Sequence, residues 1–192
     1  KSVPSAEMVK FTASGTEATM LAMRIARSAS GKKTILKFDG HFHGWHDYAL
    51  KANKPPFDSD DLPGIPKEAL GTVAAVPAND LAAVEARLAE GDIAAVILEP
   101  SGASFATVPL ADGFLAGLRE LTAKAGVILI FDEVITGFRW GPGGAQDRFG
   151  IVPDMTTMAK IVAGGLPGGA VAGKHEIMDV LTFKDEPDWN KT

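Results

Sequence analysis

The 192-residue sequence contains no cysteine, which excludes disulfide bonds and thiol catalysis and agrees with a cytoplasmic protein. Long apolar runs are also missing. The longest weakly polar stretch, residues 161–173, is interrupted by Pro167 and five glycines. A membrane-spanning helix needs about 20 consecutive apolar residues, so this stretch is too short to cross a bilayer. We therefore expect no membrane partner.

Long basic runs are equally absent. The formal net charge is −5 and the isoelectric point is about 5.4. A nucleic acid is bound by a concentrated positive surface, so no nucleic-acid partner is expected. A small anionic ligand would have to be held by local positive groups. Hydrophobic residues make up 46% of the sequence, which is ample for the core of one domain.

What is present is an alternation of helix and strand patterns. Ser14 and Glu17 have the spacing of a capping box, which predicts a helix that runs to Gly31. The other predicted elements are strands over residues 34–38, 93–98 and 127–131 and helices from Asn79 to Glu90 and from Asp112 to Ala125. Residues 51–66 hold four prolines and predict a long surface loop. Alternating strands and helices form a mostly parallel sheet sandwiched by helices, so the predicted fold class is α/β.

Two acidic residues stand at the ends of predicted strands. Glu99 follows the second of these strands, and Asp132 follows the third. Open α/β sheets bind their ligands outside the carboxyl ends of the strands, so both side chains are expected near a ligand crevice. Glu133 and Arg139, which lie beside Asp132 in the sequence, are interpreted as members of surface or structural ion pairs.

Asp132 and Lys160 together suggest pyridoxal phosphate chemistry. A carboxylate at a strand end can place a negative charge against a pyridinium nitrogen, and a lysine can form a Schiff base with an aldehyde. Residues 158–162 surround Lys160 with apolar side chains in the sequence, and apolar surroundings favour the uncharged amine. Each residue alone has a commoner explanation, because strand-end aspartates often cap helices and most lysines are solvated.

Three segments, in this order, carry a resemblance to a known family. Residues 9–18 resemble the phosphate-binding turn of the fold-type I, class III pyridoxal phosphate aminotransferases. Residues 131–139 resemble their cofactor-nitrogen segment, and residues 157–160 resemble their Schiff-base segment. The resemblance is closest to the glutamate-1-semialdehyde 2,1-aminomutase branch. It implies that residues 1–192 form the large domain of the fold, without the family's N-terminal segment and C-terminal small domain.

The resemblance implies roles for the residues in these segments. The phosphate of pyridoxal 5'-phosphate is assigned to Ser14, Gly15 and Thr16. This agrees with the chemistry of a helix N-terminus, where free N–H groups stabilise a phosphate dianion. Asp132 would face the ring nitrogen. Lys160 would hold the cofactor as a Schiff base and later move a proton.

Further residues would surround the cofactor ring. Phe42 stands where the family often has a tyrosine stacked on the ring, and it keeps the stacking surface without the hydroxyl. Val134 would pack on the opposite ring face. The adjacent His43 is given a structural or cofactor-adjacent role. Ser104 aligns with a position where the aminomutases carry asparagine near the phenolic oxygen.

The implied activity is amino-group transfer. An amino-acid or amine donor and a carbonyl acceptor would be the substrates of an aminotransferase, whereas an aminomutase would move the group between adjacent carbons of one substrate. A homodimer is implied as well. A truncated, catalytically weak cofactor-binding or interaction domain is the alternative, because parts of the family's enzyme are not found in the sequence.

Two other motifs point to different chemistry. His41, His43 and His46 have the histidine spacing of a metallohydrolase zinc site. The acid of that motif is missing, and His175 is the single histidine that remains, so no metal is expected. Residues 168–175 match the glycine and lysine positions of a nucleotide-binding P-loop. They end in histidine where magnesium binding needs serine or threonine, which disfavours a nucleotide.

Overall fold

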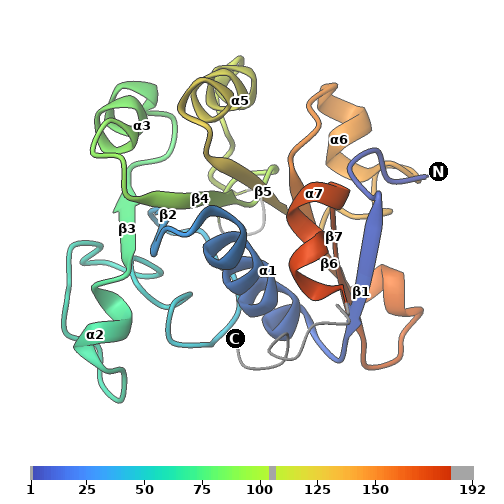
Figure 1. Cartoon of the computed structure of the whole chain (residues 1–192), viewed down its shortest axis with the longest axis horizontal. Helices are drawn as coiled ribbons and strands as arrows, with labels where there is room; N and C mark the ends of the chain where they lie inside the picture. Colours follow the sequence, from blue (N-terminus) through green and yellow to red (C-terminus); the bar gives the residue numbers. More distant parts are fainter. Residues whose placement is uncertain (1, 104–106, 183–192) are drawn as a thin grey trace.

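The computed structural model describes residues 2–103 and 107–182. In this part of the chain seven strands form one sheet, in the order β1-β7-β6-β5-β4-β2-β3 (Figure 1). The strands are β1 (Met8–Thr12), β2 (Thr34–Phe38), β3 (Val73–Val76), β4 (Ile93–Leu98), β5 (Ile128–Asp132), β6 (Met155–Ala159) and β7 (Gly169–Gly173). The predicted strand over residues 34–38 is β2, and the strand over residues 93–98 is β4.

The sheet is mostly parallel, as the sequence predicts. β2 pairs in parallel with β3 and β4, β4 with β5, and β5 with β6. Among the described strands, only β7 runs antiparallel to its neighbours, β6 and β1. Six strands therefore point the same way, and their carboxyl ends meet at one edge of the sheet.

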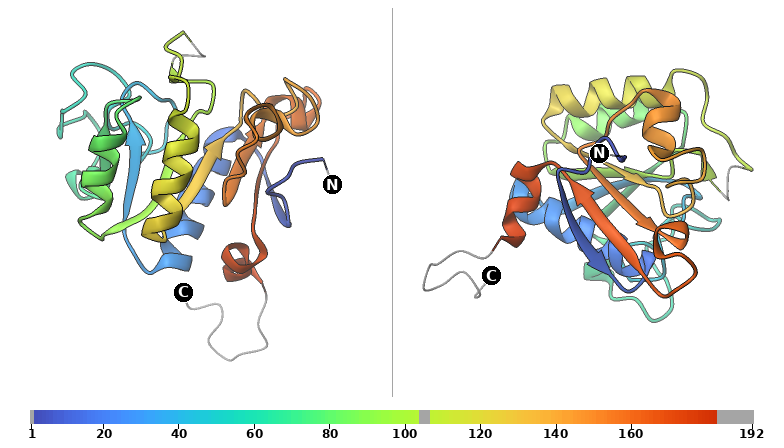
Figure 2. Two further views of the ribbon diagram at one scale, coloured as in Figure 1. Left: turned by 90° about the horizontal axis from the view of Figure 1, so that it is seen from above. Right: turned by 90° about the vertical axis from the view of Figure 1, so that its right-hand side faces the viewer.

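Helices cover both faces of this sheet. The described α-helices are α1 (Gly15–Ser30), α2 (Lys67–Leu70), α3 (Leu81–Leu88), α5 (Phe114–Ala125), α6 (Gly144–Phe149) and α7 (His175–Met178). Two short 3-10 helices are η1 (Lys160–Ala163) and η2 (Asp179–Leu181). The right-hand view of Figure 2 shows α3 and α5 on one side of the sheet and α1 on the other. No helix within the described ranges is long and apolar enough to cross a membrane.

Two apolar clusters hold the layers together. Successive side chains of a strand point to opposite faces of a sheet, and β5 shows the consequence. Ile128 and Ile130 pack in the cluster under α1, whereas Leu129 and Phe131 pack in the cluster under α3 and α5. Full burial of one such side chain contributes about 1.5–3 kcal/mol. The continuous apolar pattern of β5 follows from burial on both faces.

The start of α1 confirms the Ser14 half of the predicted capping box, and the return bond of Glu17 goes to the residue before the N-cap. Ser14 Oγ accepts a hydrogen bond from the Glu17 amide at 3.1 Å. Glu17 in return accepts one from the Ala13 amide at 2.6 Å. The helix ends before Gly31, whose φ of 69° is readily adopted by glycine. Local sequence alone therefore places both ends of α1.

Two predicted helix caps are each wrong by one residue. Asp80, and not Asn79, caps α3, because the Asp80 side chain accepts from the Ala83 amide at 2.9 Å. Asn79 has a φ of 66° and instead binds the Ala111 amide through its side-chain oxygen at 2.7 Å. α3 also ends at Leu88 and not at Glu90.

The second error concerns α5. Gly113 and not Asp112 occupies the N-cap position, and no side chain caps this helix. The predicted carboxyl end at Ala125 is confirmed, with Gly126 as the left-handed stop.

The P-loop candidate is excluded by its backbone, because most of residues 168–175 form β7, an extended strand paired on both sides.

Candidate active site

Most of the predicted site residues meet at the carboxyl edge of the sheet, around a cavity of about 360 Å³. α1 begins after β1, the loop with Phe42 follows β2, and Glu99 follows β4. Asp132 ends β5 and Lys160 follows β6. The predicted residues that line the cavity are Ser14, Gly15, Thr16, Phe42, Asp132, Val134 and Lys160. The expected placement of Glu99 and Asp132 at one crevice is confirmed, because both line this cavity.

The start of α1 provides an anion-binding turn. In the described residues, the Gly15 and Thr16 amides have no hydrogen-bond acceptor, because they precede the first intrahelical bond. A Cβ at Gly15 would lie 3.1 Å from both methyl groups of Val134 and would narrow the cavity. Free amides, the positive end of a 16-residue helix and open space together suit a phosphate group.

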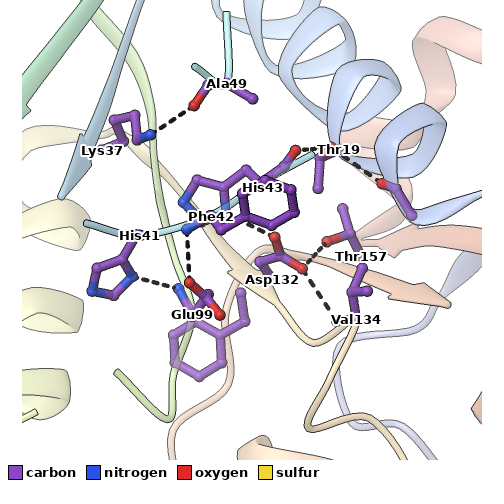
Figure 3. A network of polar contacts seen from close by, with 12 residues as sticks. Thr19, Lys37, His41, Phe42, His43, Ala49, Glu99, Asp132, Val134 and Thr157 are labelled. Carbon is purple, nitrogen blue, oxygen red and sulfur yellow. Dashed lines mark hydrogen bonds and ion pairs between the residues drawn. The ribbon is translucent and has the colours of Figure 1, made fainter. Parts of the chain in front are cut away.

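Asp132 is buried and held by three donors (Figure 3). Its Oδ1 atom accepts from the Val134 amide and from the Thr157 hydroxyl, both at 3.1 Å. Its Oδ2 atom lies 2.7 Å from Nδ1 of His43. These contacts fix the carboxylate at the cavity wall and leave it little freedom to rotate.

His43 lies behind Asp132 and does not line the cavity. Burial lowers the pKa of His43 more than its hydrogen bond to Asp132 raises it. The ring is therefore neutral near pH 7 and donates its Nδ1 proton to the carboxylate. The Thr19 hydroxyl of α1 donates to the His43 carbonyl oxygen at 2.6 Å, which ties this loop to α1. A structural or cofactor-adjacent role was predicted for His43, and the structure shows its contact with Asp132.

Phe42 stands at the cavity wall with 46% of its surface exposed. Its amide donates to Oε1 of Glu99 at 2.7 Å. The next turn of this loop lies close to α1, because a Cβ at Gly44 would be 2.8 Å from the Thr16 hydroxyl. Glycine at position 44 therefore allows the loop that carries Phe42 to pack closely against the start of α1.

Glu99 has a larger part in the site than its position in the sequence suggested. Its side chain is bound to Phe42, and its own amide donates to Nδ1 of His41 at 3.0 Å. Burial raises the pKa of Glu99 to about 7. The strand-end position predicted where Glu99 lies, but the contacts with the loop after β2 are tertiary and have no signal in the sequence.

Lys160 lines the cavity from η1, with a left-handed φ of 51°. A non-glycine residue in this conformation is uncommon and often marks a functional site. The expectation of apolar surroundings is wrong in part. Met158 and Ala159 are buried in β6, but Lys160 itself is exposed and Ile161 has 44% of its surface exposed. The turn of η1 directs these side chains away from the core.

The histidines of the zinc-like motif have separate partners. His41 accepts from the Glu99 amide, His43 contacts Asp132, and Nε2 of His46 lies 3.3 Å from the Thr19 hydroxyl. Burial lowers the pKa of His41 to about 3 and that of His46 to about 4. Across the described residues, no group of three or more His, Cys, Asp or Glu side chains could hold a metal ion.

Three remaining predictions concern the neighbours of the site. Ser104 lies outside the described residues. Glu133 is buried and forms no ion pair with another described residue. It accepts hydrogen bonds from the Thr136 hydroxyl, the Ala145 amide and the Gln146 side chain, so the ion-pair interpretation is wrong for Glu133. Arg139 is exposed, and none of the ion pairs among the described residues involves it.

The fold and this site define a class of protein. A mostly parallel sheet with a helix N-terminus, a buried carboxylate and a lysine around one cavity at its carboxyl edge is the arrangement of the fold-type I pyridoxal phosphate enzymes. The chain belongs to the class-III aminotransferase family, whose model (Aminotransferase class-III) matches residues 1–188.

Curated relatives support the same assignment. The chain is 48% identical over 184 residues to glutamate-1-semialdehyde 2,1-aminomutase of Ignicoccus hospitalis. It is 50% identical over 183 residues to the protein of the same name from Sulfurisphaera tokodaii. These alignments cover 93% and 94% of the chain and 44% of each relative. The chain thus spans less than half the length of these relatives.

Solved structures have the same fold. An omega-transaminase from Sphaerobacter thermophilus superposes with a TM-score of 0.85 at 40% identity, over 95% of this chain and 44% of that one. A transaminase with PLP bound gives a TM-score of 0.86 at 34% identity, over 97% and 44%. A glutamate-1-semialdehyde aminomutase variant from Pseudomonas aeruginosa in complex with PMP gives 0.82 at 32% identity, over 95% and 42%.

Proposed function

We propose that this chain binds pyridoxal 5'-phosphate in the cavity and carries out amino-group transfer, with Lys160 as the covalent attachment point of the cofactor. One observation carries the proposal. Asp132, Lys160 and the start of α1 come from three separate segments and line a single cavity. Their chemistry suits the three reactive parts of this cofactor, which are a ring nitrogen, an aldehyde and a phosphate.

The chain's residues fit each part of the cofactor. The free amides of Gly15 and Thr16 would bind the phosphate. Phe42 and Val134, which both line the cavity, would flank the ring. The Asp132 carboxylate is already held by its three donors, so it needs little reorganisation to pair with a cationic ring nitrogen.

The chemistry divides between the cofactor and the chain. When bound, pyridoxal phosphate supplies an aldehyde that reacts with amines and a ring that accepts electron density. Asp132 would hold a proton on the ring nitrogen, because a fixed negative charge favours the protonated form. The Lys160 amine would add and remove the proton at the substrate carbon, since it stands at the cavity and can act as a general base.

The relatives and the cavity rim support a proposal for the substrates and partners. An amino-acid or amine donor with a carbonyl acceptor, or one substrate of an aminomutase, is the proposed substrate class. Trp45 and Leu166 have 73% and 76% of their surfaces exposed, and Leu166 lines the cavity. Exposed apolar side chains at a site favour cover by another protein surface, which supports a homodimer. The proposed location is the cytoplasm.

A titration tests this function. Pyridoxal phosphate added to the purified chain should give a near-visible absorption band of the covalently bound cofactor. Lys160→Ala should lose the band, and Lys54→Ala, which removes an exposed lysine away from the cavity, should keep it. Equal bands in the two variants would contradict the role of Lys160. A native chain without any band would favour the alternative of a weakly binding interaction domain.

A further inference from the structure

Glu99 is a second acidic side chain at the cavity, and neither the phosphate, the ring nitrogen nor the aldehyde accounts for it. It lies at the end of β4, next to the strand that ends in Asp132. Only 5% of its surface is exposed, and it lines the cavity. A carboxyl group is rarely buried without a partner or a role, so its contacts indicate what it does.

Glu99 holds the loop after β2 at two points (Figure 3). Its Oε1 atom accepts the Phe42 amide at 2.7 Å, and its amide donates to the His41 ring at 3.0 Å. The position of the Phe42 ring at the cavity wall therefore depends on Glu99. One carboxyl oxygen makes this contact, and the second has no hydrogen-bond partner among the described residues.

The charges around Glu99 keep both of its protonation states accessible. Burial raises its pKa to about 7, the Phe42 amide opposes this rise, and the negative charge of Asp132 adds to it. The cations Lys37 and Lys160 lower the pKa of Glu99 by smaller amounts. The rings of His41 and His43 are neutral near pH 7, because burial lowers the pKa of each.

Lys37 is the buried cation of this group. It is fully buried in β2, and its Nζ donates to the carbonyl oxygens of Ala49 and Lys51 at 2.8 and 2.7 Å. Burial lowers the pKa of Lys37 to about 8. Lys37 is therefore mostly charged at pH 7, but it loses its charge as the pH rises through about 8, close to the range in which Glu99 titrates.

We propose that Glu99 is a positioning residue that acts in its neutral form, with its carbonyl oxygen bound to the Phe42 amide and its O–H group donating a hydrogen bond into the cofactor cavity. This inference rests on the proposed function. The neutral form keeps the contact that places Phe42, adds a donor for the cofactor or substrate, and avoids repulsion between two adjacent carboxylates.

Glutamine imitates this form. The amide oxygen of Glu99→Gln can accept from Phe42, and its NH2 group can donate into the cavity at every pH. Glu99→Ala removes both contacts. Glu99→Asp keeps a carboxyl group, but its shorter side chain no longer reaches the Phe42 amide. It replaces the alanine variant in the tests if that variant does not fold. Glu133→Gln is the matched control, because burial also raises the pKa of Glu133 but that side chain does not line the cavity.

The first test uses the chain without cofactor. Infrared difference spectra should show the carbonyl band of a protonated carboxyl group that disappears as the pH rises through about 7. Glu99→Gln should lose this band, and Glu133→Gln should retain it. A band that titrates near pH 7 with equal strength in Glu99→Gln and in the native chain, or no titrating band in the native chain, would overturn the neutral form of Glu99 whether or not pyridoxal phosphate binds.

The second test measures binding of pyridoxal phosphate from pH 6 to 9. The native affinity should fall by about tenfold above pH 7, the size expected for one lost hydrogen bond. Glu99→Gln should lack the part of the pH dependence that belongs to Glu99, and Glu99→Ala or Glu99→Asp should bind more weakly throughout. A glutamine variant as weak as the alanine variant would refute the neutral donor. Loss of binding in the native chain would instead refute the proposed function.

Discussion

Nδ1 of His43 lies 2.7 Å from Oδ2 of Asp132, and both side chains are buried at the carboxyl edge of the sheet. The contact joins the loop after β2 to the end of β5. It matters because Asp132 faces the cavity whereas His43 does not. A residue outside the cavity thus helps to set the orientation of the carboxylate inside it.

This contact predicts the effect of changing His43. His43→Ala should weaken pyridoxal phosphate binding about ten- to a hundredfold, because a hydrogen bond to a charged group contributes about 1.5–3 kcal/mol. His43→Asn, which retains a side-chain N–H donor, should bind more tightly than the alanine variant. Absorbance titrations of both variants at pH 7.5 provide the comparison, and equal affinities for the native chain and both variants would argue against this role.

Ser14 allows helix capping and phosphate binding to be separated. Ser14→Ala removes the cap on α1 and should cost about 1 kcal/mol, or roughly 2–4 °C in Tm for a chain of this size. Ser14→Asp keeps a capping oxygen and should preserve the Tm, but its negative charge should repel the cofactor phosphate. Thermal melts and binding titrations report the two effects. If Ser14→Asp binds the cofactor as well as the native chain does, the phosphate is not held at this turn.

Asp154 joins α5, β5 and the N-cap of α7 on the side of the fold away from the site. It accepts from Arg119 at 2.9 Å, from the Leu129 amide at 2.8 Å and from Lys174 at 2.7 Å. Burial raises the pKa of Asp154, but these donors outweigh burial and leave the pKa below the ordinary value of 3.8. A lowered folded-state pKa stabilises the fold above the unfolded-state pKa and loses that effect as the pH falls.

Asp154→Asn should therefore lower the free energy of unfolding at pH 7 by about 2–3 kcal/mol, a figure that allows for the partial exposure of both cationic partners. The difference between the native chain and the variant should shrink below about pH 4, where the unfolded state is protonated. Urea unfolding at pH 7 and pH 3 measures it. A difference of the same size at both pH values would rule out the charge of Asp154 as its cause.

The sequence predicts those elements whose causes are local. The ends of α1 follow from Ser14, Glu17 and Gly31, and β2 and β4 follow from apolar runs buried on both faces. The start of α3 was missed because Asn79 and Asp80 are both suitable caps. Asn79 does not cap the helix because its side-chain oxygen accepts from the Ala111 amide, 32 residues away. A local sequence pattern does not contain this contact.

The site divides in the same way. Asp132 and Lys160 could be recognised because their spacing and neighbours resemble a family. The position of His43 behind Asp132 and the contact between Glu99 and Phe42 depend on how separate strands pack. The exposed position of Lys160 depends on the turn of η1. Apolar residues next to a lysine in the sequence do not show whether its side chain is buried in the folded structure.

The identity of the lysine that carries the cofactor is the central claim, and borohydride reduction followed by peptide mapping tests it most directly. Reduction at a low excess of pyridoxal phosphate should fix the label on Lys160, because the bound phosphate and ring hold the aldehyde at this amine. The label should vanish in Lys160→Ala and persist in Lys54→Ala. A dominant label on Lys174, or labelling spread over the surface lysines, would contradict the account.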